Sequence, residues 1–298
     1  MAAPPVDLTV SLVNTNNGAM LERCLRSIEQ NANGITLQVI VVDNASTDDS
    51  RAMLAREFPH IVVLENSERL GFGASHNRAL ARGTGRYLII LNDDTEILPH
   101  CLEMLVAFMD AHADAGACGP RLINPDGSLQ RTANRFPTLL FGVFEALSLN
   151  RLLPNNPVLR ENLYAEWDRN TTRAVDAVSG AALLIRREAM AQIGLLDEKF
   201  FIYSEEVDWC YRLHRRGWKI YYVADAQTIH YGGQSTATRA PKKFHDIYWN
   251  SFLYYYQKHF GQFAYLLLKA LYQLRMFVRS LAARSKIKNR KSKIENQV

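Results

Sequence analysis

The strongest constraint on the fold is a regular alternation of short apolar segments with segments of helical spacing. Four apolar runs are expected to form strands: Leu8–Val13, Leu37–Val42, Ile61–Leu64 and Tyr87–Leu91. The segments expected to form helices are Ala19–Gln30, Ser46 to about Phe58, Ala74–Arg82 and Pro99 to about His112. This alternation predicts an α/β fold with a mostly parallel, twisted sheet and helices on both faces.

The second half of the chain is less regular. Several prolines punctuate residues 119–170, so we expect a long, partly irregular excursion of the kind that often closes over a site. Regular structure is expected again at Ala177–Ile185, in a helix from Arg187, in a helix from Glu205 to Arg216 and in a strand at Lys219–Val223. From Asp246 to about Ala283 the chain is expected to be helical. We therefore predict a domain over residues 1–240 and a helical extension over 241–298.

Composition is ordinary for a globular protein, since 48% of the 298 residues are hydrophobic and 22% are charged. The N-terminus lacks the pattern of a secretory signal, and no run of some 18 uncharged apolar residues predicts a membrane span. The four cysteines show no C-x-x-C spacing. They are expected to be reduced thiols of a cytoplasmic protein.

The positive charge is concentrated at the C-terminus. From Arg275 onward there are eight basic residues and one acidic residue, a net +7 that leaves −2 for the rest of a chain whose total is +5. This distribution argues against a general nucleic-acid surface and for a local anionic partner.

One strand candidate ends in two adjacent carboxylates. Leu88–Thr95 reads L-I-I-L-N-D-D-T, which places Asp93 and Asp94 directly after an apolar run. In open α/β sheets, ligands bind beyond the carboxyl ends of the strands. Two like charges this close repel unless a cation lies beside them, and oxygen ligands suit magnesium or manganese shared with substrate phosphates. The alternative is a solvated acidic turn.

Two further features could contact a ligand near this edge. Asp43 ends the second expected strand, where its carboxylate could accept a hydrogen bond from a ribose hydroxyl or a base N–H, or could cap the next helix. Gly71-Phe-Gly resembles a phosphate loop, but position 76 is His, so G-x-G-x-x-G is not matched.

The helix expected from Glu205 carries three acids in its first turn. The helix dipole favours acids there, and Asp208 with Arg212 forms a plausible structural i,i+4 pair. Partial burial of Glu205 or Glu206 beside aromatic residues would raise a carboxyl pKa toward general-base work. Further on, His230 precedes a glycine-rich loop and is either a packed residue or a metal ligand.

As an ordered set, these pieces resemble a family 2 glycosyltransferase of the GT-A fold, in particular the bacterial rhamnosyltransferase-like members. The matching segments extend from about Leu8 to Gln234. They are V-S-L-V-N-T-N-N, V-V-D-N-A-S-T-D-D-S, L-G-F-G-A-S-H-N-R-A, L-N-D-D-T, V-S-G-A-A-L-L-I-R-R, G-L-L-D-E-K-F-F-I-Y-S-E-E-V-D-W-C-Y-R and H-Y-G-G-Q-S.

The resemblance implies a role for each matching residue. Asp94 would hold a divalent cation together with His230, and Glu206 would be the catalytic base, with Glu205 as the alternative. The donor would be bound by Asn14, Asp43, Asn44, Gly71, Phe72, Gly73, Asn77, Asn92, Asp93, Gly180 and Ala181. The family's E-D position is Glu-Glu in this chain, which leaves the choice of base open.

The implied activity is inverting transfer by a magnesium- or manganese-dependent enzyme of the hexosyltransferase class. The donor would be dTDP-rhamnose, with a UDP-sugar as the alternative. The acceptor would be a hydroxyl of a glycan or a polyprenyl-linked molecule in cell-surface polysaccharide synthesis. The expected location is the cytoplasm, at the inner face of the cell membrane, and no nucleic-acid partner is expected.

The C-terminal segment has two interpretations. Phe263 to Leu281 is apolar at helical spacing with Lys269, Arg275 and Arg279 interspersed, which suits either a helix packed on the core or an interfacial helix on anionic lipid. Three other classes of protein are alternatives to a glycosyltransferase. A sugar-nucleotide pyrophosphorylase would need a basic glycine-rich loop near Leu8–Gly18, and that segment has none. A membrane-associated scaffold that used only the C-terminal segment would leave the four acids Asp93, Asp94, Glu205 and Glu206 unexplained. A catalytically inactive relative would not need to retain these four acids.

Overall fold

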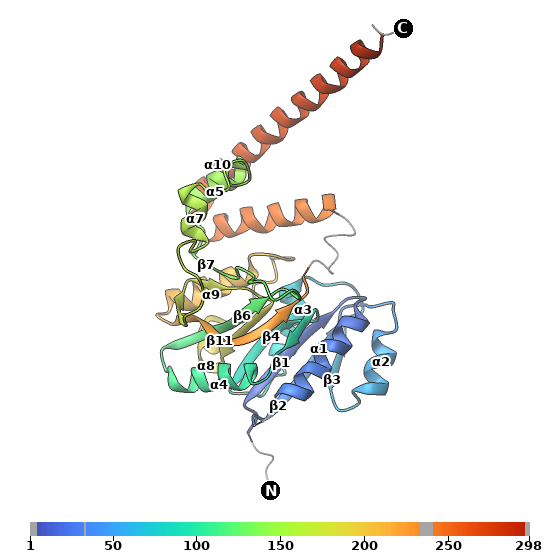
Figure 1. Ribbon diagram of the computed structural model, residues 1–298, viewed down its shortest axis with the longest axis vertical. Helices are drawn as coiled ribbons and strands as arrows, with labels where there is room; N and C mark the ends of the chain where they lie inside the picture. Colours follow the sequence, from blue (N-terminus) through green and yellow to red (C-terminus); the bar gives the residue numbers. More distant parts are fainter. Residues whose placement is uncertain (1–4, 33, 233–240, 296–298) are drawn as a thin grey trace. The chain divides into compact units, whose positions relative to one another are not determined.

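The computed structural model describes residues 5–32, 34–232 and 241–295, with the side chains of 241–244 and 281–295 outside the description. The chain divides into two compact units (Figure 1). The sheet unit comprises Met1–Phe136 and Leu163–Ser251, and the helical unit comprises Pro137–Asn162 and Phe252–Val298. The boundary predicted at residue 240 falls in 233–240, outside the described residues.

The sheet unit is built on a nine-stranded mixed sheet. Its order is β3 (Val62–Glu65), β2 (Leu37–Asp43), β1 (Leu8–Asn14), β4 (Tyr87–Asn92), β10 (Ala182–Arg186), β6 (Ala115–Ile123), β11 (Lys219–His230) and β5 (Thr95–Ile97), with β8 (Arg173–Val175) paired to β11. The four strands of the first half are parallel, as predicted. Strand β10 is antiparallel to both β4 and β6. A two-stranded sheet pairs β7 (Ala133–Asn134) with β9 (Ala177–Val178).

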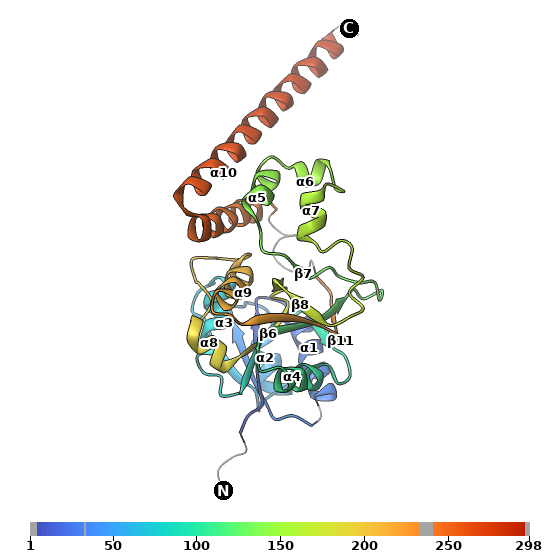
Figure 2. The same cartoon turned by 90° about the vertical axis from the view of Figure 1, so that its left-hand side faces the viewer.

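Helices cover both faces of the large sheet. Helices α1 (Gly18–Asn31), α2 (Ser50–Glu57) and α4 (Cys101–Ala111) contribute to the core on one face, and α3 (Phe72–Leu80), α8 (Arg187–Ile193) and α9 (Glu205–Arg215) cover the other (Figure 2). Strand β4 serves both cores, with Ile89 in one and Ile90 in the other. Burial on both faces explains why this strand is continuously apolar in the sequence.

Two expectations about the second half need correction. The strand predicted at Lys219–Val223 continues to His230 after a register shift between Val223 and Gln227. The segment Ala177–Ile185 is broken at Ser179–Ala181, between β9 and β10. The excursion, predicted as partly irregular, contains the short helices α5 (Leu139–Ala146), α6 (Leu149–Leu152) and α7 (Pro157–Asn162). Pro157 is the first residue of α7, a position where the missing N–H of proline costs nothing.

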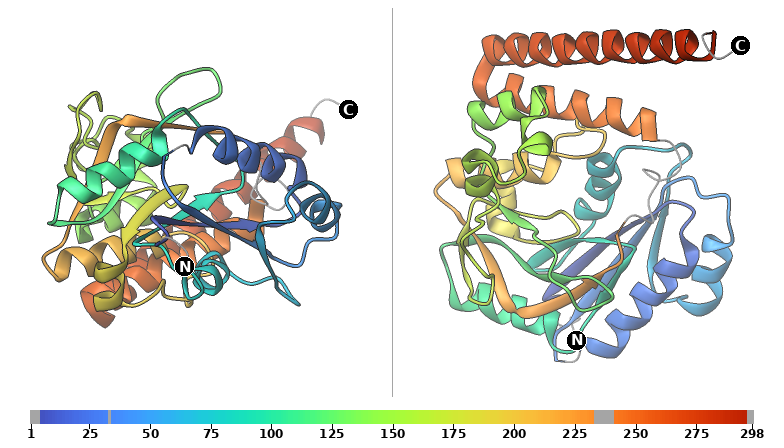
Figure 3. Two further views of the ribbon diagram at one scale, coloured as in Figure 1. Left: turned by 90° about the horizontal axis from the view of Figure 1, so that it is seen from below. Right: turned by 45° about the horizontal axis from the view of Figure 1, so that its top comes forward.

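The helical unit contains α5, α6, α7 and most of α10 (Pro241–Glu295). Helix α10 is interrupted at Gly261, whose φ of 84° and ψ of 178° produce the sharp bend seen in Figure 3. The Tyr256 hydroxyl donates to the Thr138 carbonyl at 2.8 Å, and Arg275 Nη1 donates to Ser148 Oγ at 2.5 Å. Within the described part of the chain, no helix combines the length and apolarity needed to cross a bilayer.

Candidate active site

The predicted site begins where three parallel strands end. In the register of β1, Asn14 lies opposite Asp43 of β2, and Val13 lies opposite Asn92 of β4. The carboxyl ends of parallel strands lie at the same edge of a sheet. This register therefore brings Asn14, Asp43, Asn92 and the following Asp93 together at that edge. All of these residues belong to the sheet unit.

Asp43 is buried and held in place by its neighbours. Asn14 Nδ2 lies 3.5 Å from Asp43 Oδ1, and the Ser46 amide donates to Asp43 Oδ2 at 3.1 Å. Helix α2 begins only at Ser50, whose amide donates to the Asp48 carboxylate. The alternative role for Asp43 as a helix cap is therefore wrong. Its carboxylate remains an acceptor fixed at the strand end.

The pair Asp93 and Asp94 is electrostatically unfavourable without a cation. Burial, together with the charge of Asp94, raises the pKa of Asp93 to about 7, although a hydrogen bond from the Asn17 side chain favours the ionised form. Asp94 itself is buried, with only 5% of its surface exposed. A divalent cation would neutralise this pair, which a solvated acidic turn would not require.

His230 lies beside Asp94 because β11 pairs with β5. This pairing sets His230 opposite Thr95, and His230 Nε2 lies 3.3 Å from Asp94 Oδ1. The Tyr231 amide also donates to the Asp94 carbonyl at 2.9 Å. The sequence interpretation of His230 as a partner of Asp94 therefore has a direct geometric basis.

Gln130 sets the orientation and tautomer of the His230 ring. Its amide nitrogen donates to the His230 carbonyl at 2.6 Å and to Asn124 Oδ1 at 2.7 Å, which fixes the amide orientation. Gln130 Oε1 then accepts from His230 Nδ1 at 2.9 Å. A proton on Nδ1 leaves Nε2 with a lone pair directed toward Asp94 and the Asn92 side chain, the arrangement typical of a metal-ligating histidine.

The described residues contain no group of three His, Cys, Asp or Glu side chains arranged to hold a metal ion. At this edge Asp94 and His230 are close enough that both could ligate one cation. Such a partial ligand set suits a cation whose remaining ligands are water and substrate phosphate oxygens, as is common for magnesium.

The Ser179–Ala181 break places Gly180 and Ala181 at the same edge. The Asn92 amide donates to the Ala181 carbonyl at 2.9 Å, which ties the break to the end of β4. A Cβ atom added at Gly180 would lie 3.4 Å from Glu206 Cβ and 3.6 Å from Phe72 Cζ. Glu206 and Phe72 thus line the Gly180 backbone, close to the end of β4.

The two glutamates of α9 differ in exposure. Glu205 is buried, and its Oε2 atom has no hydrogen-bond partner among the described residues. Burial and the charge of Glu206 raise the pKa of Glu205 well above its ordinary value. Glu206 is only half-buried, and burial also raises its pKa. Accessibility and the contact with Gly180 both favour Glu206 as the group that meets a substrate.

The start of α9 is held by structural contacts. Tyr203 and Ser204 both have positive φ, at 72° and 73°, a strained conformation of the kind found near functional sites. Asp208 accepts from Arg212 Nε at 2.8 Å, and the remaining guanidinium nitrogens donate to the Ile193 and Leu195 carbonyls. The structural interpretation of the Asp208–Arg212 pair is confirmed.

Other predicted donor ligands are engaged in packing. Asn77 exchanges hydrogen bonds with both main-chain groups of Leu196, and Asn44 does the same with Leu70. Phe72 donates its amide to the Phe201 carbonyl at 2.7 Å, and Gly73 is buried against Leu196. These contacts give Asn44, Asn77 and the Gly71–Gly73 loop a structural role, while their contact with donor stays a prediction.

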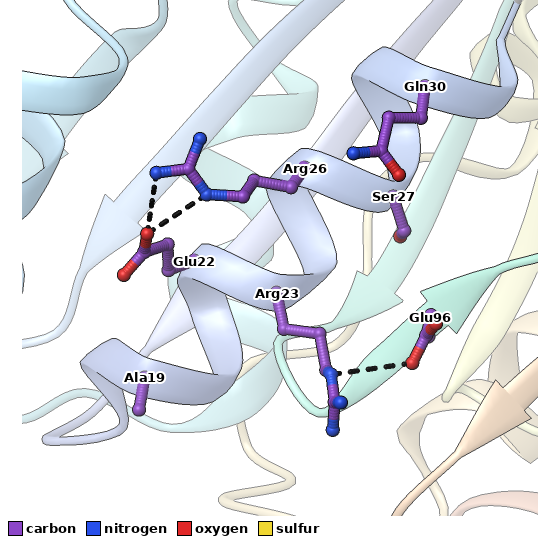
Figure 4. Close-up of a pocket in the computed structure, with 7 residues that line it drawn as sticks. All are labelled: Ala19, Glu22, Arg23, Arg26, Ser27, Gln30 and Glu96. Atoms are coloured by element: carbon purple, nitrogen blue, oxygen red, sulfur yellow. Dashed lines mark hydrogen bonds and ion pairs between the residues drawn. The ribbon is translucent and has the colours of Figure 1, made fainter.

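Gln130 and Asn17 were not among the predicted site residues. Gln130 lies 100 positions from His230, in a segment without a recognisable pattern, so only the fold brings the two together. Asn17 is the last residue of the matching segment V-S-L-V-N-T-N-N, which was a usable signal. A separate pocket lies along α1 and contains none of the predicted site residues (Figure 4). Its lining residues are Ala19, Glu22, Arg23, Arg26, Ser27, Gln30 and Glu96.

A model of the family described as "Glycosyl transferase family 2" matches residues 9–194, more than half of the chain. The chain belongs to glycosyltransferase family 2. It is 31% identical over 240 residues to an N-acetylglucosaminyl-diphospho-decaprenol L-rhamnosyltransferase of Mycobacterium tuberculosis, covering 77% of each chain. The resemblance drawn from the sequence is thereby confirmed, and this family 2 glycosyltransferase is rhamnosyltransferase-like.

Solved structures confirm the GT-A fold of this glycosyltransferase. A mannosyltransferase from Pyrobaculum calidifontis in complex with GDP-Man and Mn2+ has a TM-score of 0.55 at 18% identity, over 98% of this chain and 82% of that one. GalNAc-T7 with UDP, GalNAc and Mn2+ has a TM-score of 0.57 at 16% identity, over 87% and 51%. At these identities the likeness establishes the fold alone.

Proposed function

We propose that this glycosyltransferase moves a sugar, with inversion, from a nucleoside diphosphate to an acceptor hydroxyl, using a divalent cation at Asp94 and His230. The observation that carries this proposal is the 3.3 Å approach of Asp94 Oδ1 to His230 Nε2 at the end of β4. Manganese or magnesium bound there would supply Lewis-acid stabilisation of the leaving diphosphate.

The residues of the chain supply binding and proton transfer. Asp43 accepts a hydrogen bond from the base or ribose, and Asp93 contacts the ribose or donor sugar at the same edge. Glu206, beside Gly180, removes the proton from the acceptor hydroxyl as that oxygen attacks the anomeric carbon from the face opposite the diphosphate. The sugar–phosphate bond breaks, and the diphosphate leaves with the bonding electrons.

The donor and acceptor are proposed from the relatives. The Mycobacterium tuberculosis relative is named for rhamnosyl transfer to a decaprenol-linked diphosphosugar. We infer dTDP-rhamnose as donor and a polyprenyl-linked diphosphosugar as acceptor, in cell-surface polysaccharide synthesis at the inner face of the cell membrane. A carboxylate at Asp43 fits the N–H of either thymine or uracil, so a UDP-sugar is the second candidate.

A transfer assay tests the proposal. Purified protein is incubated with dTDP-rhamnose or UDP-sugars, N-acetylglucosaminyl-diphospho-polyprenol and manganese, and released nucleoside diphosphate and product are quantified. We expect transfer from dTDP-rhamnose that EDTA abolishes and Asp94→Ala removes. Transfer from a UDP-sugar alone would reassign the donor. No transfer from any donor, with nucleotide binding retained, would indicate an inactive relative and overturn the proposal.

A further inference from the structure

The part of α10 that follows Gly261 has one packed face and one exposed apolar face. Ala264 and Leu268 are buried within the helical unit. Phe263, Leu266, Ala270, Leu274 and Phe277 follow one another at intervals of three or four residues, which places them in one line along a helix. We call these five residues the apolar stripe.

The apolar stripe is exposed to an extent unusual for large hydrophobic side chains. Phe263, Leu266, Leu274 and Phe277 expose between 53% and 76% of their surface. Scattered exposed apolar residues need no explanation, but a continuous line of them marks a surface that meets a partner.

Polar and basic residues border the apolar stripe on one side. At 100° per residue, Lys269 and Gln273 fall beside the stripe. Arg275 and Arg279 instead lie on the side of the helix that carries the buried Ala264 and Leu268, and Arg275 donates to Ser148 Oγ within the helical unit. The sequence from Arg275 onward carries a net +7. An exposed apolar line on a helix that continues into a strongly basic segment is the pattern of a helix that lies in the plane of a membrane interface.

We propose that the apolar stripe docks this protein onto an anionic bilayer surface, with the helix parallel to the membrane plane. Anionic headgroups complement the +7 segment. A second copy of the chain packed on the stripe with its helix parallel would instead bring two +7 segments together. None of the described helices, including the one that carries the stripe, is long and apolar enough to span a bilayer. The proposed contact with the membrane is therefore peripheral.

Vesicle co-sedimentation tests this inference with the full-length protein. The vesicles are phosphatidylcholine alone or phosphatidylcholine mixed with phosphatidylglycerol. We expect sedimentation with the mixed vesicles, weaker sedimentation with phosphatidylcholine alone, and a decrease as salt rises. The triple variant Phe263→Ser, Leu274→Ser and Phe277→Ser should bind the mixed vesicles about a hundredfold more weakly.

Met276→Ser is the matched control, because Met276 is an exposed apolar residue of the same helix that lies off the stripe. This variant should sediment like the wild type. All replaced side chains are exposed, and circular dichroism with urea unfolding confirms that each variant folds. Equal sedimentation of the triple variant and the wild type would overturn the inference. So would a concentration-dependent dimer that the triple variant abolishes without any change in sedimentation.

Vesicle binding needs neither donor nor acceptor, so this test is separate from the transfer assay. If the protein binds vesicles but transfers no sugar, the membrane role of the apolar stripe is supported and the proposed transferase activity is contradicted. If the protein transfers sugar but does not bind vesicles, the activity is supported and the membrane role is contradicted.

Discussion

At the scale of single residues, the site contains two pairs of adjacent acids whose members differ in contacts and burial. Asp93 and Asp94 are adjacent, as are Glu205 and Glu206, yet each member meets a different environment. His230 contacts Asp94, while Asn17 hydrogen-bonds to Asp93. Glu205 is buried, whereas Glu206 lies half-exposed beside Gly180. The predictions at this scale separate the members of each pair.

Replacing Glu206 with Gln should reduce turnover by about 10²–10⁴-fold, because the amide cannot accept the acceptor's proton. The dissociation constant for donor should stay nearly unchanged, since the substitution leaves Asp43, Asp94 and His230 in place. Steady-state kinetics with calorimetric donor binding checks both values. A full loss in Glu205→Gln with activity retained in Glu206→Gln would assign the base to Glu205.

The pH dependence of turnover follows from the same residue. Burial raises the pKa of Glu206, and only its ionised form accepts a proton. We therefore expect kcat to fall as pH decreases through a midpoint above the ordinary glutamate value of 4.5. A midpoint at or below that value would contradict the role of Glu206 as the base.

Replacing Glu205 with Gln should stabilise the protein at neutral pH by about 1–3 kcal/mol, because an ionised carboxylate with an unpartnered oxygen is costly to bury. The raised pKa means that the folded state binds more protons than the unfolded state, so wild-type stability falls as pH rises above about 4.5. Urea unfolding from acid to neutral pH should show the variant's advantage growing. An advantage constant with pH would contradict this assignment.

Replacing Gln130 with Leu should weaken manganese activation about 10–100-fold, because His230 would lose the acceptor that fixes its tautomer. The manganese dependence of transfer measures this effect. Ser128→Ala is the control, since the Ser128 hydroxyl bonds to Asn124 and Asp126 and is not among the contacts that hold Gln130 or His230. Equal manganese dependence in Gln130→Leu and wild type would show that Gln130 does not position a ligand.

At the scale of elements, the strand ends were predictable and the connections between them were not. The apolar runs of β1, β2 and β4 are buried on both faces, so their sequence marks both the strands and the edge where Asp43 and Asp93 lie. The antiparallel β10 and the extension of β11 to His230 depend on pairing partners far away in the sequence. The contact of Gln130 with His230 could not be predicted for the same reason.

Helix α3 and the segment before α9 approach closely at Gly71. A Cβ atom there would lie 2.7 Å from the Phe201 carbonyl oxygen, so Gly71→Ala forces two backbone segments apart. We expect a loss of about 1–3 kcal/mol in urea unfolding and a lower turnover, since the Phe201 segment leads to Glu206. Gly18→Ala is the control because its nearest contact, at 2.9 Å, is the movable Ser50 hydroxyl. Equal losses in the two variants would contradict this reasoning.

At the scale of the whole molecule, the two proposed functions belong to different units. The sheet unit contains every predicted site residue, and the helical unit contains the apolar stripe. The α/β class with a mostly parallel sheet followed from the strand–helix alternation, and the GT-A fold followed from the resemblance of the motifs to family 2 glycosyltransferases. The grouping of residues 137–162 with the end of α10 did not, because their contacts, such as Tyr256 with Thr138, join segments far apart in the sequence.

The central claim is that the acids at the carboxyl end of β4 bind a divalent cation, and that this cation binds the diphosphate of the donor. A crystal structure with dTDP or UDP and manganese, with the metal located by its anomalous scattering, tests it most directly. We predict a manganese peak about 2.0–2.3 Å from Asp94 and from His230 Nε2, bridged to the diphosphate, with the base near Asp43. A nucleotide bound elsewhere, or manganese without contact to Asp94, would contradict the claim.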